Sequence, residues 1–218
     1  MTLAIFDLDN TLLADDSDYL WGLFLADQGI VDRDYYLREN ERFFQEYKEG
    51  RLDIYEFLRF SLKPLSEHPL DYLYALRERF LLERIEPLLL PASSALLQKH
   101  REVGDILMIV TATNSFVTSP IAKRLGVDYL IATEPEMSDG RYTGEVAGEP
   151  AYREGKVKRL NAWLDAHHQD LKGSSFYTDS HNDIPLLELV DNPVAVDPDS
   201  LLAEYAGSRN WPLISLRG

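Results

Sequence analysis

The architecture of this 218-residue chain follows from one short segment, LAIFDLDNTL, from Leu3 to Leu12. Leu3 to Phe6 is an uninterrupted apolar run, the pattern of a strand buried on both faces of a parallel sheet. On extended backbone, side chains two residues apart point to the same side, so we expect Asp7 and Asp9 to share one pocket. Such a pair can also be a turn or a solvated sheet edge, and its setting in the chain must decide.

Two further patterns follow along the chain. Residues 17–85 carry apolar side chains at spacings of three and four, as at Leu70, Leu73 and Leu76, which indicates a helical bundle. From Pro91 onward, short apolar runs alternate with amphipathic segments. The strands predicted there cover residues 106–110, 129–132, 175–177, 194–196 and 213–216, and Asp139-Gly140 predicts a small hairpin.

This alternation predicts an α/β fold with a doubly wound, mostly parallel sheet. Residues 1–16 and 86–218 would form the core, and residues 17–85 a helical-bundle cap inserted after the first strand. In such a sheet, ligands bind at the carboxyl ends of the strands.

Polar residues follow several of the predicted strands and begin one of the predicted helices. Thr111 follows one strand and can donate to a phosphate oxygen, and Asp179 and Asp183 follow another. Lys156 begins a helix, where a cation is disfavoured by the helix dipole but well placed to meet an anion. Each residue alone can be a cap, a turn or a surface group. Their convergence on one sheet edge favours a binding site.

The composition limits the kind of ligand. The chain has 37 acidic and 22 basic residues, a formal net charge of −15 and no cysteine. The negative charge disfavours nucleic acids and anionic membranes as partners and indicates a small ligand. Disulfides and thiolate metal sites are excluded. No apolar run approaches about 18 residues, so we expect a cytoplasmic protein without membrane association.

Four sequence elements, Asp7-x-Asp9-x-Thr11, Thr111, Lys156 and Asp179-x-x-x-Asp183, resemble the four motifs of the haloacid dehalogenase superfamily in order and context. The resemblance spans the whole chain. The helical insertion is similar to that superfamily's C1-type cap, and residues 139–144 are similar to a hairpin of its phosphoserine-phosphatase-like branch. The resemblance implies a phosphoric monoester hydrolase that uses Mg²⁺ and a small phosphorylated metabolite.

The resemblance implies a role for each motif residue. Asp7 would attack phosphorus and form an aspartyl-phosphate, and Asp9 would act as general acid and then general base. Mg²⁺ would be held by the carboxylates of Asp7 and Asp179 and by the main-chain oxygen of Asp9. The remaining motif residues would hold phosphate or orient the residues that do: Thr111, Lys156, Asn182 and Asp183.

The substrate must be inferred from the insertion. It holds 14 of the 24 aromatic residues, most of them expected in the bundle core, and an aromatic wall suits a flat or extended leaving group. Asp16 lies nine residues after Asp7, where the phosphoserine-phosphatase-like branch commonly places an acid that meets an ammonium group. Phosphoserine would also need a cation for its carboxylate, with Arg42, Arg51 and Arg59 as candidates. We therefore favour histidinol phosphate over phosphoserine.

The motifs in this chain depart from the branch pattern at two places. The branch often has Ser-Gly-Gly and Gly-Asp-Gly where this chain has Thr111-Ala112-Thr113 and Thr178-Asp179-Ser180. Larger side chains beside the phosphate favour a substrate other than phosphoserine. The histidines at positions 68, 100, 167 and 168 are predicted to be surface residues, and His181 is given no catalytic role because histidine is a poor ligand for Mg²⁺.

Other functions remain open at this stage. A receiver domain of a signalling pathway also accepts phosphate on an aspartate in a doubly wound fold, but it needs neither Asp9 nor a 69-residue insertion. A noncatalytic relative is disfavoured because all four motif positions carry competent residues. A phosphotransferase or a dehalogenase of the same superfamily also remains possible, although a dehalogenase needs no acid at Asp9.

Overall fold

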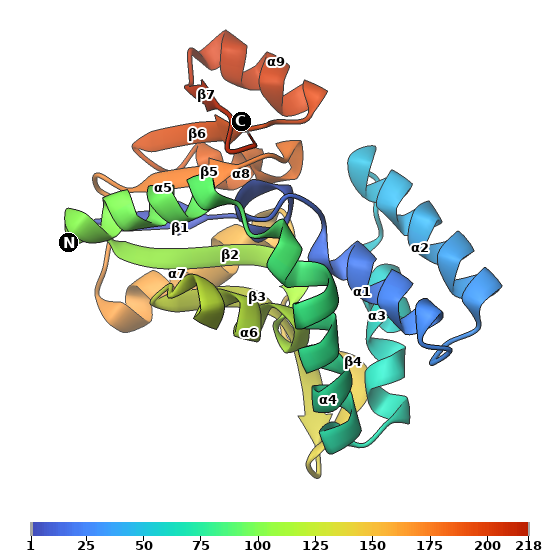
Figure 1. Ribbon diagram of the computed structural model, residues 1–218. Coiled ribbons are helices and arrows are strands. Elements are labelled where there is room, and N and C mark those ends of the chain that lie inside the picture. Colours follow the sequence, from blue (N-terminus) through green and yellow to red (C-terminus); the bar gives the residue numbers. More distant parts are fainter. Residues whose placement is uncertain (1, 218) are drawn as a thin grey trace.

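A seven-stranded sheet forms the centre of the computed structural model, which describes residues 2–217 (Figure 1). The strand order is β4-β3-β2-β1-β5-β6-β7, and only the β3–β4 pair is antiparallel among the pairs in these residues. The strands are β1 Leu3–Phe6, β2 Ile106–Asn114, β3 Tyr129–Ser138, β4 Arg141–Ala147, β5 Ser175–Thr178, β6 Asn192–Val196 and β7 Leu213–Ile214.

Helices cover both faces of the sheet, as predicted for a doubly wound fold. One face packs against α5 Pro91–Glu102 and α6 Ser115–Leu125. The other packs against α7 Glu154–His167, α8 Ile184–Leu187 and α9 Ser200–Arg209. Successive residues of β1 alternate between the two cores, which explains why the strand reads as a continuous apolar run.

The insertion after β1 is helical, as predicted, and lies beside the carboxyl end of the sheet (Figure 1). Its main helices are α1 Ser17–Asp27, α2 Arg33–Lys48, α3 Ile54–Glu67 and α4 Leu70–Phe80. Trp21 of α1 packs against Phe80 of α4 and Phe116 of α6, with ring centroids 5.1 and 5.7 Å away. The helices therefore share an apolar core with one face of the sheet. The division into a core and a cap at residues 17 and 85 stays a prediction.

The structure departs from the predicted strand ends in one respect that bears on the site. β2 continues to Asn114, and its pairing with β3 shifts register between Val110 and Asn114. Thr111 therefore lies within the strand, at an irregular place, and does not follow its end. Across residues 2–217, no helix combines the length and the apolar character needed to cross a bilayer.

Gly155 is required where α7 begins. A Cβ atom there would lie 2.0 Å from the main-chain oxygen of Pro150, which is far inside van der Waals contact. By contrast, a Cβ atom at Gly207 of α9 would meet no other residue within 4 Å. The start of α7, and with it the place of Lys156, therefore depends on a close backbone approach.

We expect Gly155→Ala to lower the free energy of unfolding by about 2 kcal/mol, because the backbone around Pro150 must shift. Gly207→Ala is the matched control and should raise stability by about 0.5–1 kcal/mol through helix propensity. Urea unfolding followed by circular dichroism measures both. Equal stability of Gly155→Ala and wild type would contradict the close approach.

Candidate active site

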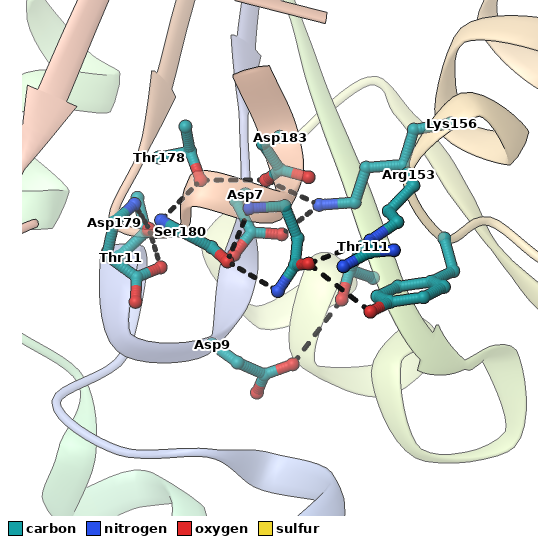
Figure 2. A network of polar contacts seen from close by, with 12 residues as sticks. Asp7, Asp9, Thr11, Thr111, Arg153, Lys156, Thr178, Asp179, Ser180 and Asp183 are labelled. Carbon is teal, nitrogen blue, oxygen red and sulfur yellow. Dashed lines mark hydrogen bonds and ion pairs between the residues drawn. The ribbon is translucent and has the colours of Figure 1, made fainter. Parts of the chain in front are cut away.

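The motif residues converge at the carboxyl ends of the central strands (Figure 2). Asp7 directly follows β1, and its main-chain N–H donates to Tyr177 O of the neighbouring β5 at 2.8 Å. After Asp7 the chain turns sharply, and Asn10 has a φ of 56°. This turn directs the chain into the helical insertion and leaves Asp7 and Asp9 at the sheet edge.

Lys156 is the cation at the centre of the site. Its Nζ donates to Asp7 Oδ1 and to Asp183 Oδ2, both at 2.7 Å, and its side chain is only 3% exposed. Burial alone would lower the pKa of Lys156, but the two carboxylates hold that pKa above its ordinary value. Thr178 Oγ1 also donates to Asp183 Oδ2, at 2.7 Å. Lys156 therefore stays charged and in place.

The surroundings of Asp7 disfavour its charged form, whereas those of Lys156 favour the charged form of the lysine. Burial raises its pKa to about 7, although Lys156 opposes this shift, and the charges of Asp183 and Asp9 raise it further. Asp7 is 5% exposed. Even with Lys156 bonded to it, the Asp7 carboxylate is poorly solvated, so a bound cation would stabilise its charged form.

Asp9 is held by hydrogen bonds from the helical insertion and from β2. Its Oδ1 accepts from Ser17 N at 2.7 Å, and its Oδ2 accepts from Thr113 Oγ1 at 2.7 Å and from Thr111 Oγ1 at 3.4 Å. Burial raises the pKa of Asp9, and the donors Ser17 and Thr113 oppose the rise. An acid with a raised pKa suits proton transfer near neutral pH. Thr113 was not among the predicted site residues.

Asp179 directly follows β5, the strand that pairs with β1, and so lies beside Asp7. Its Oδ1 accepts from Thr11 Oγ1 at 3.0 Å, and Thr11 Oγ1 accepts from Asp179 N at 3.0 Å. Burial and then the charge of Asp7 raise the pKa of Asp179 well above its usual range. Asp7 and Asp179 therefore repel one another in a place that water reaches poorly.

This donor set fits a hard divalent cation. Four carboxylates, those of Asp7, Asp9, Asp179 and Asp183, are accompanied by Lys156. Asp7 and Asp183 are buried, and Asp9 and Asp179 are half-buried. Throughout residues 2–217, no group of three acidic or histidine side chains is arranged to hold a metal by itself. Mg²⁺ needs only one or two carboxylates, completed by a carbonyl oxygen and water. Asp7 and Asp179, of which the first raises the pKa of the second, meet this requirement.

A pocket opens over Asp7 and Asp9, closed by the helical insertion. Its apolar and aromatic wall comes mainly from α1, α2 and α3 and consists of Tyr19, Phe43, Phe44, Tyr47, Leu52, Ile54, Phe57 and Tyr152. The charged residues in the lining are Asp7, Asp9, Asp16, Asp18 and Lys156. Within the described lining, Lys156 is thus the sole basic residue, and two carboxylates already hold it.

Asp16 and Asp18 stand together where α1 begins. Asp16 caps the helix, because its Oδ1 accepts from Asp18 N and Tyr19 N, both at 2.9 Å. Burial and then the charge of Asp9 raise the pKa of both acids, that of Asp18 to about 7. Asp18 has one long contact, from Asn114 Nδ2 at 3.5 Å. Sequence reasoning missed Asp18, although its spacing of two from Asp16 was a signal.

The three arginines considered as partners for a substrate carboxylate lie outside this pocket. Arg42 is surrounded by Glu39, Glu46 and Glu56 at 2.8–3.0 Å, and Arg51 pairs with Glu49. Arg59 lines a separate groove between α2 and α3.

Asn182 does not line the pocket, and its amide instead joins other parts of the protein. Its Oδ1 accepts from Arg153 Nε at 2.9 Å and its Nδ2 donates to Tyr47 O at 3.3 Å. His181 Nδ1 contacts Asp199 Oδ2 at 2.7 Å, and neither residue lines the pocket.

The prediction of a surface position for His100 was wrong, because its ring is buried between Asp105 and the Tyr177 hydroxyl, 2.8 Å from each.

Comparisons with known proteins identify the family of the chain. Residues 4–188 match the family model of haloacid dehalogenase-like hydrolases. A protein from Neisseria meningitidis serogroup C (strain 8013), named histidinol-phosphatase, is 41% identical over 219 residues, covering 99% of each chain.

Two solved structures share the fold. A protein of unknown function from Bordetella pertussis Tohama I has a TM-score of 0.92 and 45% identity, covering 99% of this chain and 100% of its own. A substrate-bound phosphoserine phosphatase has a TM-score of 0.73 and 21% identity, covering 98% of this chain and 92% of its own, and so supports the fold alone. From the match over most of its length, the chain belongs to the haloacid dehalogenase-like hydrolase family.

Proposed function

We propose that this protein is a Mg²⁺-dependent phosphomonoesterase that forms an aspartyl-phosphate on Asp7, with histidinol phosphate as its best substrate. One observation carries the choice of substrate. The pocket over Asp7 combines an aromatic wall with two acids, Asp16 and Asp18, and the described lining offers no cation besides Lys156. A pocket of this kind suits a leaving group that is flat and positively charged.

In the proposed reaction, a carboxylate oxygen of Asp7 bonds to phosphorus as the bond to the leaving oxygen breaks. Asp9 gives its proton to that oxygen, and then takes a proton from the water that cleaves the aspartyl-phosphate and releases inorganic phosphate. Two hydrogen-bond donors, Lys156 and Thr111, would hold the phosphoryl oxygens. The bond from Lys156 to Asp183 fixes the direction of its ammonium group.

Asp7, Asp179 and the main-chain oxygen of Asp9 would hold Mg²⁺. When bound, the ion would neutralise negative charge on the phosphoryl oxygens and on the carboxylates of the site. The ion would also supply the local positive charge that a chain with a net charge of −15 needs to bind an anionic phosphate.

Histidinol phosphate carries an amine and an imidazole ring and lacks a carboxylate. Asp16 uses Oδ1 to cap α1, so its second oxygen and the carboxylate of Asp18 remain for the substrate's N–H groups. The rings of Tyr19 and Phe44, with centroids 4.9 Å apart, give the wall for a flat ring. The Neisseria relative that shares 41% identity is named for this activity.

Phosphoserine is the second candidate, because it shares the amine and the phosphate. Its carboxylate would need a cation, and the arginines at positions 42, 51 and 59 lie outside the pocket. That carboxylate would also lie near Asp16 and Asp18, and burying like charges together is unfavourable. A phospho-accepting signalling switch is disfavoured because it would not need Asp9, which Ser17 and Thr113 hold beside Asp7. We propose that the protein acts in the cytoplasm on a small metabolite and has no nucleic acid or membrane partner.

We expect Asp9→Asn to slow hydrolysis of an alkyl phosphate by about 10² to 10⁴. The loss should be smaller for p-nitrophenyl phosphate, because a good leaving group needs no proton. Steady-state kcat on the two esters measures the difference. Asp7→Asn is the control and should be inactive on both esters, whereas an equal loss for Asp9→Asn on both would contradict the acid role.

Mg²⁺ is expected to raise the melting temperature of the wild-type protein, and more at pH 8 than at pH 6. The pKa of Asp7 is raised to about 7 in the metal-free site, so protons compete with the ion increasingly as the pH falls. Asp179→Asn should abolish the shift, and EDTA should remove both the shift and turnover. A shift that is equal at both pH values, or that survives in Asp179→Asn, would refute this metal site.

The substrate is tested by kcat/KM for histidinol phosphate, phosphoserine and propyl phosphate, measured with Mg²⁺. We expect histidinol phosphate to be the best. Asp16→Asn and Asp18→Asn should each lower its kcat/KM by about 10- to 100-fold, and that of propyl phosphate by less than about threefold. Asparagine caps helices as well as aspartate does, so the change isolates the charge.

Asp53→Asn is the matched control, since Asp53 caps α3 in the same way but lies outside the pocket lining. It should leave all three values unchanged. If propyl phosphate matches the amine esters, or if Asp16→Asn and Asp18→Asn affect all three esters equally, the proposed recognition is wrong.

A further inference from the structure

The C-terminal end of α2 is tied to the catalytic side of the sheet by Arg153. Arg153 directly precedes α7, and its Nε donates to Asn182 Oδ1 at 2.9 Å. Its Nη2 donates to the main-chain oxygen of Gly50, in the turn after α2, which lies 103 residues away in the sequence. One guanidinium group thus joins the helical insertion, the loop after β5 and the start of α7.

A second tie runs parallel to the first. Tyr47, in the last turn of α2, lies with its hydroxyl 3.1 Å from Ser180 Oγ, and its main-chain oxygen accepts from Asn182 Nδ2 at 3.3 Å. Ser180 caps the short helical turn that carries Asp183. The end of α2 is therefore bonded to the same loop that orients Lys156.

The backbone of Arg153 is held in an unusual conformation. Its φ of 51° and ψ of −121° lie in a region that residues other than glycine rarely adopt. Such a conformation persists only when surrounding contacts hold it, and here they include a cation–π contact with the Tyr152 ring at 5.2 Å. Lys156 follows three residues later, so the conformation of Arg153 sets where α7 begins.

The turn after α2 also packs closely on this region. Gly50 has a φ of 66°, and a Cβ atom there would lie 2.8 Å from Arg153 Nη2 and 2.9 Å from His181 Nε2. A side chain at position 50 would push Arg153 away. Glycine thus serves both the turn and the contact.

We propose that Tyr47, Gly50, Arg153, Ser180 and Asn182 form a clasp that holds α2 closed over the catalytic aspartates. Arg153 is its positioning residue, and it couples closure of the insertion to the placement of Lys156 at the start of α7. The kinetic consequence rests on the proposed phosphatase function. The clasp itself is a structural inference and is testable without any turnover.

Hydrogen exchange measured by mass spectrometry tests the clasp directly. In Arg153→Ala, amide exchange in residues 46–54 should rise about tenfold, the effect of losing one hydrogen bond from a charged donor. Arg159→Ala is the matched control on α7, because the polar partners of Arg159 among the described residues are Glu149 and Glu134, which lie outside α2. It should leave exchange in residues 46–54 at the wild-type rate.

Kinetics test the coupling to Lys156. With p-nitrophenyl phosphate and Mg²⁺, Arg153→Ala should lower kcat about tenfold, Arg159→Ala should not, and Arg153→Lys should restore part of the loss. Gly50→Ala disturbs the clasp from the α2 side and should produce the same rise in exchange and the same fall in kcat. It decides the question if Arg153→Ala does not fold.

Each result has one meaning. Exchange in residues 46–54 that stays at the wild-type rate in both Arg153→Ala and Gly50→Ala would overturn the clasp. Faster exchange there with an unchanged kcat would overturn the positioning role of Arg153. An inactive wild-type protein would defeat the proposed phosphatase function, and faster exchange in the variants would then still support the clasp.

Discussion

The bonds of Lys156 to Asp7 and Asp183 are the interaction on which the site depends. A buried ammonium group is costly unless carboxylates surround it, and two 2.7 Å contacts meet that need here. The same contacts join three distant parts of the chain, β1, α7 and the loop after β5. The arrangement exists only because β1 lies between β2 and β5, so that their carboxyl ends meet at one edge.

The excess of negative charge at this edge then limits which ligands can bind there. Burial raises the pKa of Asp7, Asp9 and Asp179, and neighbouring carboxylates raise the pKa of Asp7 and Asp179 further. A divalent cation bound there would offset the charge of these carboxylates and allow an anionic phosphoryl group to bind beside them. Asp16 and Asp18 extend the acidic character into the pocket. In the proposed function, these two acids would favour a cationic leaving group over one that carries a carboxylate.

Much of the fold was predictable because it rests on local patterns. Apolar runs identified the parallel strands, and polar residues after them marked the edge where Asp7, Lys156 and Asp179 meet. The resemblance to the haloacid dehalogenase superfamily was confirmed by the family match. The predictions failed where a side chain's partner lies far away in the sequence. His100 sits in a polar helical stretch, yet Tyr177, 77 residues later, buries its ring.

The sequence alone was enough to establish the sheet, the helical insertion and the chemical types at the strand ends, because hydrophobic period and residue order are local properties. Tertiary structure decided the rest. It showed that Thr113 holds Asp9, that Asp18 joins Asp16 in the pocket and that the candidate arginines point elsewhere. It also placed Arg153 against Gly50. Contacts of this kind depend on how helices and strands pack in space. The spacing of Asp16 and Asp18 was a local signal, but the partners of Asp9 and Arg153 lie about 100 residues away along the chain.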